Sequence, residues 1–425
     1  MPAIENIHLR LAERETSMAV IGLGYVGLPL AIEFSRYFDV IGYDIDANLI
    51  ECLSQDRHNS RTIKFTSREA DIADASFYVI AVPTPLGKDN NPNLSSLIEA
   101  THAIARYLRP GDYVVYESTV YPGCTENRCI PLLEQNSGLV CGKDFKVGYS
   151  PERINPGAKE HSVSNTVKII GACDNESLEY ISRVYNMIVT AGVYKVTCIK
   201  AAEATKILEN IQRNVNIALM NEMSVLFSSL GIDTAEVIEA ASTKWNFHDY
   251  VPGLVGGYCI PVAPMYAISR ASECGIDMPL ITTACTVNDS MPAYIVNSVL
   301  NRLSVTDRST PLRALVMGFT YKENIDDTRS SLVPSIIRLL EEASVEVDIV
   351  DPYANSDNVY DMYGLELRNQ PRAPYDLIIV TVAHDSYKKH GDSYFKSLAR
   401  SEDSLLVDLK WIYRGRIKSL RYFSL

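Results

Sequence analysis

The chain has 425 residues, 47% hydrophobic and 22% charged, with a formal net charge of −12. This composition is ordinary for a globular protein of two or three domains, and the acidic balance argues against a nucleic-acid or anionic-membrane surface. We see no apolar run of about 18 residues that would span a membrane, and no signal peptide is expected. The nine cysteines are scattered, and nothing completes a zinc set around Cys124 and Cys129. We therefore expect no metal and a cytoplasmic protein with reduced thiols.

The first third of the chain alternates short apolar runs with helical patterns. Residues 27–37 read as a helix between the first two strands. Strands alternating with helices predict a parallel sheet covered on both faces. The predicted strands are 18–22, 39–43, 77–82, 112–116 and 167–171.

One long periodic segment follows, from residue 198 to 230, with apolar residues at helical spacing. A helix of that length suits a connector between domains and a dimer surface. More short helices are expected to about residue 303. The α/β rhythm then restarts, with predicted strands at 312–319, 345–350, 376–382 and 405–408.

The glycines Gly22, Gly24 and Gly27 form a G-x-G-x-x-G pattern after the first strand, and Asp44 ends the second strand. This context is typical of a dinucleotide site, in which the helix N-terminus receives the pyrophosphate. An acid at Asp44 accepts from ribose hydroxyls and repels a 2′-phosphate, so NAD is favoured over NADP. The alternative is a glycine-rich turn without a cofactor.

Two further polar segments each follow a strand, Val82-Pro-Thr-Pro85 and Glu117-Ser-Thr-Val120. Ligands bind at the carboxyl ends of strands in such sheets. Thr84, Ser118 and Thr119 are therefore candidates for cofactor or substrate contact, and ordinary turn chemistry is the alternative.

Cys259 stands just after a glycine pair and just before a proline in the segment 251–264. Glycines let backbone approach a ligand closely, and a thiol there can serve as a nucleophile. The alternative is a buried cysteine that only fills space.

Eight ordered motifs resemble the UDP-glucose/UDP-mannose dehydrogenase family, and they cover nearly the whole chain. They are IGLGYVGLPLA (21–31), VPTP (82–85), YESTVYPG (116–123), YSPERINPG (149–157), KILEN (206–210), RNVNIAL (213–219), GLVGGYCIP (253–261) and GFTYKENIDDTRSS (318–331). The resemblance implies an α/β chain of three domains. These are an N-terminal Rossmann-type NAD domain (1–197), a central helical dimerisation domain (198–304) and a C-terminal UDP-sugar-binding α/β domain (305–425).

The branch of the family follows from three segments. Residues 151–157, 209–213 and 244–247 resemble the UDP-N-acetylglucosamine 6-dehydrogenases of surface-polysaccharide synthesis. The galacto and manno epimers of the sugar stay open, and UDP-glucose is the more distant alternative.

The resemblance implies a four-electron oxidation of C6 of the sugar, with NAD as the cofactor. Cys259 matches the nucleophile that carries the thiohemiacetal and thioester. Lys206 and Asn210 lie at i and i+4 on one helix face, and would polarise and hold the sugar oxygen. Glu152 matches the glutamate that activates water for thioester hydrolysis. The alternatives are a solvated helix lysine at 206 and a helix-start acid at 152.

The same motifs supply the expected binding residues. Lys322 and Arg329 are expected to meet a diphosphate, or else to form an ordinary surface charge pair. The expected cofactor contacts are Gly22, Gly24, Tyr25, Val26, Gly27, Asp44, Thr84, Thr119 and Arg329. The expected substrate contacts are Arg153, Ile154, Asn155, Arg213, Gly256 and Lys322.

The chain departs from the family pattern around the expected nucleophile. Tyr258 and Ala263 stand where the family usually has histidine and aspartate, and Val251 and Cys285 where larger or charged residues are common. Three hypotheses follow: an active enzyme that relies on Glu152, Lys206 and water; an impaired relative that still binds NAD and a UDP-sugar; or a single two-electron oxidation on the same frame.

Overall fold

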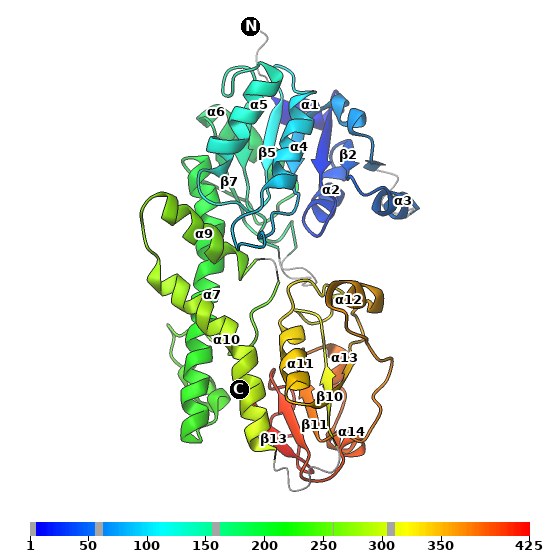
Figure 1. Ribbon diagram of the computed structural model, residues 1–425. Helices are drawn as coiled ribbons and strands as arrows, with labels where there is room; N and C mark the ends of the chain where they lie inside the picture. The colour runs from blue at the N-terminus through cyan, green and yellow to red at the C-terminus, as the bar shows by residue number, and fades with distance from the viewer. Residues whose placement is uncertain (1–5, 56–62, 155–161, 258, 304–310) are drawn as a thin grey trace. The chain divides into compact units, whose positions relative to one another are not determined.

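The computed structural model describes residues 6–55, 63–154, 162–257, 259–303 and 311–425. The chain forms two compact units (Figure 1). The first comprises Met1–Glu209 and Met265–Asp277, and the second comprises Asn210–Pro264 and Met278–Leu425. Among the helices in these described ranges, none is both long and apolar enough to cross a membrane.

The first unit is built on an eight-stranded sheet of order β3-β2-β1-β4-β5-β6-β7-β8. Every neighbouring pair is parallel except β6 and β7, which are antiparallel, so the all-parallel prediction is wrong at that one pair. The strands are β1 (Ser17–Ile21), β2 (Val40–Tyr43), β3 (Ile63–Thr66), β4 (Ala75–Ile80), β5 (Tyr113–Tyr116), β6 (Lys146–Tyr149), β7 (Lys168–Ala172) and β8 (Val193–Lys195).

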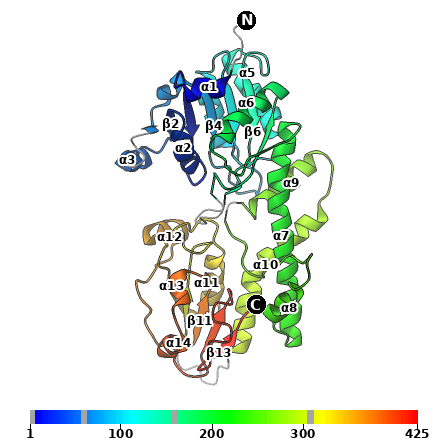
Figure 2. The ribbon, with the colours of Figure 1, turned by 180° about the vertical axis from the view of Figure 1, so that it is seen from behind.

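Helices cover both faces of this sheet, as predicted. Val20, Val79 and Val115 belong to a core shared with α1, α2 and α6, while the alternate residues of the strands face the other side. Figure 1 shows α4 and α5 against the sheet, and Figure 2 shows α2 and α6 from behind. The helices are α1 (Ile7–Ala12), α2 (Gly27–Ser35), α3 (Ala47–Gln55), α4 (Ser95–Ala105), α5 (Ile130–Ser137) and α6 (Asn175–Asn186).

The long helix is confirmed as α7 (Ile199–Leu230), 32 residues without a break. Next come α8 (Thr234–Ala241) and α9 (Val262–Glu273). The prediction of only short helices up to residue 303 is wrong, because α10 (Pro279–Arg302) runs for 24 residues. Pro292 lies inside α10 and breaks the sequence pattern of a long helix without ending it.

The second unit carries a five-stranded, fully parallel sheet of order β10-β9-β11-β12-β13. Its core joins α10 and α11 to one face of the sheet, and aromatic residues of α13 and α14 pack on the other. The strands are β9 (Leu312–Met317), β10 (Val345–Val350), β11 (Leu377–Val380), β12 (Leu405–Asp408) and β13 (Arg421–Phe423). The helices are α11 (Val333–Glu342), α12 (Ser356–Tyr363), α13 (Asp385–Lys388) and α14 (Asp392–Leu398).

Candidate active site

The turn between β1 and α2 has room only for glycine at two of its three motif positions. Gly22 has φ +89°, and a Cβ there would lie 2.9 Å from the carbonyl oxygen of Ala81. A Cβ on Gly27 would lie 1.8 Å from the carbonyl oxygen of Gly22. A Cβ on Gly24, by contrast, would meet nothing within 4 Å. The turn is thus closed on its sheet side and open where a pyrophosphate would approach.

Asp44 follows β2 and is tied to this turn. Its Oδ2 accepts the backbone N–H of Leu23 at 2.8 Å, and its Oδ1 accepts that of Asp46 at 3.0 Å. A carboxylate has about four acceptor positions. With respect to the described residues, two are therefore left for the hydroxyls of a ribose. Beside it, Tyr25 is exposed and Val26 is the N-cap residue of α2.

The loops after β4 and β5 are joined to each other, as their shared sheet edge predicts. The Thr84 hydroxyl donates to the carbonyl of Thr119 at 2.7 Å, and the Ser118 hydroxyl donates to that of Val82 at 2.7 Å. Tyr266 of α9 donates to the carbonyl of Thr84 at 2.9 Å. Sequence reasoning missed Tyr266, because 182 residues separate it from its partner.

These features fit NAD. The open Gly24, the N-terminus of α2 and the two free acceptor positions of Asp44 match its pyrophosphate and ribose. Arg329, also expected to contact the cofactor, is paired with Asp327 of its own loop at 2.8 Å.

Glu152, which follows β6, lies in a buried ionic cluster. Its Oε1 accepts the backbone N–H groups of Arg153 and Ile154 at 2.6 and 2.7 Å. Its Oε2 accepts the ammonium of Lys168 at 2.7 Å. The same ammonium donates to Glu117 Oε2 at 2.5 Å. Within the described part of the chain, three of the four acceptor positions of Glu152 are thus filled, and one on Oε2 remains.

The two carboxyl groups in this cluster have opposite pKa shifts. Burial raises the pKa of Glu117 from 4.5 to about 7, although Lys168 acts against this. Burial acts in the same direction on Glu152, but the charge and hydrogen bond of Lys168 and the two backbone donors outweigh it, so the pKa of Glu152 is lowered. As the pH falls into the neutral range, Glu117 is therefore protonated before Glu152.

Other predicted residues gather around Glu152. The Lys206 ammonium donates to the backbone carbonyl of Glu152 at 2.5 Å. The guanidinium of Arg153 is held by Glu209 at 2.6 Å and by the carbonyl of Val167 at 2.9 Å. Asn155, another predicted contact, lies outside the described residues, and Ile154 packs against the core.

Asn210 stands one helical turn after Lys206 on α7. Its side-chain Nδ2 is buried, and among the residues that the structure describes it has no hydrogen-bond partner. A buried amide donor without a partner is costly, so this nitrogen is suited to a ligand oxygen.

Cys259 lies in the second unit and is exposed. Its carbonyl accepts the N–H of Ala263 at 3.1 Å, which places it at the first turn of α9. Unpaired N–H groups and the helix dipole stabilise negative charge there. Ala263 is fully buried and supplies neither charge nor hydrogen-bond acceptor at the position where the family pattern has a carboxylate. Tyr258 lies outside the described residues.

The loop of Cys259 packs against the loop that follows β9. A Cβ on Gly256 would lie 2.8 Å from the carbonyl oxygen of Ser330, and one on Gly257 would lie 2.8 Å from the ring of Tyr321. Both glycines are therefore required for this close contact. For Gly256, which was expected to contact the substrate, the structure shows a role in the packing of these two loops.

A pair of asparagines holds the start of the same loop. Asn221 of α7 accepts the N–H of Gly253 at 2.7 Å and donates to its carbonyl at 3.1 Å. Asn221 also donates to Asn288 of α10, which in turn donates to the carbonyl of Asn214. Sequence reasoning missed Asn214 and Asn221, although their seven-residue spacing on one helix face was visible.

Lys322, Arg213 and Lys410 are cations of the second unit that could bind an anion. Burial, opposed by Glu323 and reinforced by Arg213, lowers the pKa of Lys322. Burial also lowers the pKa of Lys410, although Glu323 and Asp408 act against this. A Cβ on Gly253 would lie 3.6 Å from the Lys410 ammonium. The like charges of Lys322 and Arg213, and the buried charge of Lys410, would all be stabilised by an anionic ligand. Lys410 was not among the predicted site residues, because it lies in no recognised motif.

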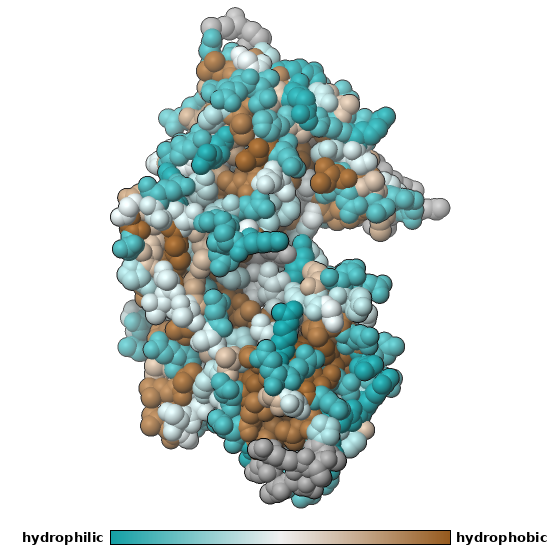
Figure 3. Space-filling view, in the orientation of Figure 1, coloured by the Kyte–Doolittle hydropathy of each residue, from teal (hydrophilic) through white to brown (hydrophobic). Residues whose placement is uncertain are grey.

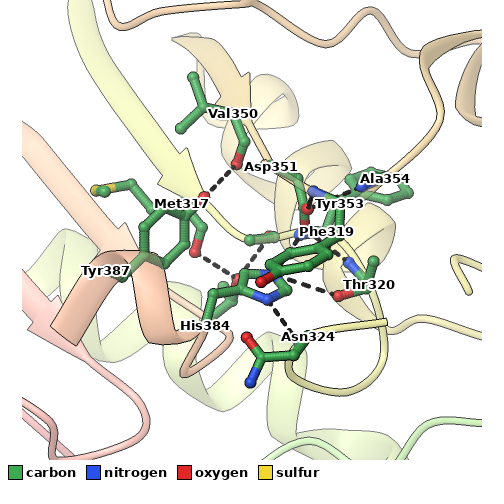
Figure 4. Close-up of polar contacts among 12 residues, drawn as sticks. Met317, Phe319, Thr320, Asn324, Val350, Asp351, Tyr353, Ala354, His384 and Tyr387 are labelled. Carbon is green, nitrogen blue, oxygen red and sulfur yellow. Dashed lines mark hydrogen bonds and ion pairs between the residues drawn. The ribbon is translucent and has the colours of Figure 1, made fainter. Parts of the chain in front are cut away.

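A buried histidine organises the carboxyl edge of the second sheet (Figure 4). His384 Nε2 lies 3.1 Å from Asp351 Oδ2, and its Nδ1 accepts the N–H of Asn324 at 3.0 Å. Asp351 Oδ2 also accepts the N–H groups of Phe319 and Thr320. The ring of Tyr353 stacks on His384. These contacts fix the loop that carries Lys322.

Comparison with known proteins gives the family. The NAD-binding, central and UDP-binding domains of the UDP-glucose/GDP-mannose dehydrogenase family match residues 16–189, 200–290 and 315–415. The chain belongs to this family. As such it is an NAD-dependent UDP-sugar dehydrogenase, and NAD is its cofactor.

Three relatives of this dehydrogenase are similar over nearly its whole length. A UDP-N-acetyl-D-glucosamine 6-dehydrogenase of Pseudomonas aeruginosa is 41% identical, covering 94% of this chain and 97% of its own. One of Salmonella typhi is 40% identical, with coverages of 96% and 99%. The solved UDP-D-ManNAc dehydrogenase of Pyrococcus horikoshii is 30% identical, with coverages of 96% and 99% and a TM-score of 0.87.

Proposed function

We propose that the enzyme oxidises C6 of UDP-N-acetylglucosamine to the carboxylate, in surface-polysaccharide synthesis. The observation that carries the proposal is the exposed Cys259 at the first turn of α9, in a loop where glycine is required. The names of the two 6-dehydrogenase relatives support the choice of sugar. We also propose that the three expected domains divide at 197/198 and 304/305, and that the enzyme acts in the cytoplasm, where its nine free thiols stay reduced.

NAD, when bound, accepts a hydride from the sugar carbon, once for each of two oxidations. Lys206 and Asn210 hold the C6 oxygen as its proton leaves, and the alcohol becomes an aldehyde. The thiolate of Cys259 then adds to C6 and forms a C–S bond. Loss of the second hydride converts this thiohemiacetal to a thioester. Water attacks the thioester, the C–S bond breaks, and Glu152 takes the proton of the water.

On the substrate, we assign the diphosphate to Lys322, Arg213 and Lys410. The repulsion between the positive charges of Lys322 and Arg213 supports this, because an anion bound between them would offset that repulsion. Arg153 and Glu209 form a pair beside Glu152, and we assign that pair to the sugar end.

A second candidate function, an impaired relative that binds its ligands without full turnover, is favoured by the residue at position 263. Ala263 is fully buried and supplies neither charge nor acceptor beside Cys259. An enzyme that depends on a carboxylate there would bind NAD and the UDP-sugar but stall.

The experiment counts NADH formed per sugar, with UDP-N-acetylglucosamine and with UDP-glucose. Two per UDP-N-acetylglucosamine support the proposal, one indicates stalled or altered chemistry, and none with binding retained supports the impaired relative. Faster turnover of UDP-glucose would overturn the choice of sugar. Cys259→Ser should abolish turnover and leave NAD binding intact. Unchanged turnover would remove Cys259 from the mechanism.

We also propose that a second copy of this chain covers α7. Leu219, Leu226 and Leu230 are about half exposed and fall within about 40° of one another around the helix. Figure 3 shows hydrophobic surface over the C-terminal part of α7. A leucine seam of this spacing is typical of helix pairing.

A further inference from the structure

The ionic cluster at Glu152 contains two residues that the mechanism above does not use, Glu117 and Lys168. The side chain of Glu117 is 0% exposed and that of Lys168 is 4% exposed. Buried charges are costly unless they are paired, and here one ammonium serves two carboxyl groups. The cluster therefore carries a net charge of −1 when all three groups are ionised.

Among the residues that the structure describes, none besides Lys168 supplies a cation to the carboxyl groups themselves. Tyr185 of α6 donates to Glu117 Oε1 at 2.5 Å, and Tyr149 of β6 donates to the carbonyl of Ser118. On the other side, Lys206 donates to the backbone carbonyl of Glu152 rather than to its carboxylate, and Arg153 is paired with Glu209. Within the described residues, Lys168 is thus the cation that both carboxyl groups share.

This arrangement limits when Glu152 can accept a proton. If Glu117 is ionised, a proton added to Glu152 leaves a neutral cluster, because Lys168 and Glu117 remain as a pair at 2.5 Å. If Glu117 is already protonated, the same step leaves an unbalanced buried ammonium. Charge balance therefore favours the step only in the first state.

We propose that Glu117 and Lys168 form one proton-sharing unit with Glu152, in which Glu117 must be ionised before Glu152 can take the proton of the attacking water. The proposal rests on the role given to Glu152 in the proposed function. Glu117 and Lys168 are positioning residues, since they act through Glu152. The pKa of Glu117, raised to about 7 by burial, puts the switch in the neutral range.

The first test does not depend on turnover. Infrared titration of the free enzyme should show a protonated carboxyl group that ionises near pH 7 and is lost in Glu117→Gln. Glu203 is the matched control, because burial raises its pKa to about 7 as well, and its carboxylate accepts from the backbone N–H groups of Gly123 and Thr125 instead of from Lys168. Glu203→Gln should remove a second band and leave that of Glu117. A Glu117→Gln spectrum identical to that of the wild type overturns the proposal.

The second test measures the acyl-enzyme. With Glu117→Gln, the two hydride transfers should still give a rapid burst of NADH. Steady-state turnover should fall about 100-fold, and a sugar adduct on Cys259 should accumulate in the mass spectrum. The acid limb near pH 7 should disappear from the pH profile of kcat. An unchanged acid limb and an unchanged steady state overturn the proposal.

Two further variants keep the proposal testable if Glu117→Gln folds poorly. Tyr185→Phe removes a donor that stabilises ionised Glu117, so the acid limb should move to higher pH with little loss of plateau activity. Lys168→Met should move the acid limb further toward high pH, because the loss of the ammonium raises the pKa of both carboxyl groups. If the wild type forms no NADH, the proposed function fails while the infrared titration still decides the charge sharing.

Discussion

At the scale of single residues, Glu117 affects stability as well as chemistry. Its pKa is about 7 in the folded chain and 4.5 as the ordinary value, so between these values the folded state holds a proton that the unfolded state has lost. The stabilising contribution is complete below pH 4.5 and is lost as the pH rises through 7. Glu152 acts in the opposite direction, because its pKa is lowered.

Glu117→Gln should therefore change how stability depends on pH. At about 1.4 kcal/mol per pH unit, the wild type should lose up to about 3 kcal/mol relative to the variant between pH 4.5 and pH 8. The measurement is urea unfolding of both proteins at several pH values. A constant difference between them across this range would show that Glu117 does not titrate there.

At the scale of elements, the turn between β1 and α2 separates a folding requirement from a binding requirement. Gly27 is needed because the carbonyl of Gly22 occupies the space of a Cβ, whereas Gly24 faces open space. Within one motif, Gly27 is thus required for folding, and Gly24 leaves space for the ligand.

Gly27→Ala should lower the free energy of unfolding by several kcal/mol, about 3 or more, because backbone must move to relieve the clash. Gly24→Ala should fold normally but bind NAD more weakly, since the added methyl group stands where the pyrophosphate approaches. Thermal unfolding without and with NAD separates the two effects. Equal stability losses in both variants would contradict this division.

The sequence predicted the elements whose patterns are local. The periodicity of residues 198–230 gave α7 almost to the residue, and Val345–Val350 and Leu405–Asp408 were found with their bounds. It missed β6, because Lys146 looks like a surface residue. In the fold Lys146 is buried and paired with Asp174 at 2.8 Å.

The candidate site divides in the same way. Motif residues such as Gly27, Asp44 and Glu152 could be proposed from the sequence because each lies in a local motif. Lys168, Glu117 and Tyr266 were not assigned a role, because theirs depends on contacts between distant segments. Lys168 reaches Glu117 across 51 residues of chain, and no local pattern encodes that pairing.

At the scale of the whole molecule, the two α/β sheets repeat one design. The order β2-β1-β4-β5 in the first corresponds to β10-β9-β11-β12 in the second. In each, an acid ends the second strand and accepts an N–H from the loop after the first, Asp44 from Leu23 and Asp351 from Phe319. The likeness that the sequence only suggested is therefore present in strand order and in a shared hydrogen bond.

The proposed pairing of α7 with a second copy gives a prediction at this scale. Leu219→Glu with Leu226→Glu should dissociate the dimer, because four buried charges would face one another across the seam. Val225→Glu is the control, since Val225 is also exposed but lies about 120° around the helix. Sedimentation velocity should give half the mass for the double variant only. The same mass for all three proteins would exclude the seam.

The bonds between Asn221 and Gly253 make the position of the Cys259 loop depend on a single amide group. Asn221 serves the backbone of Gly253 as both donor and acceptor, and donates to Asn288 with the same nitrogen. Asn221→Asp would replace that nitrogen with oxygen and turn two attractive contacts into oxygen–oxygen repulsion. A molecule changed at this one amide would thus keep its sheets and its thiol, yet lose the anchor of the loop on which that thiol depends.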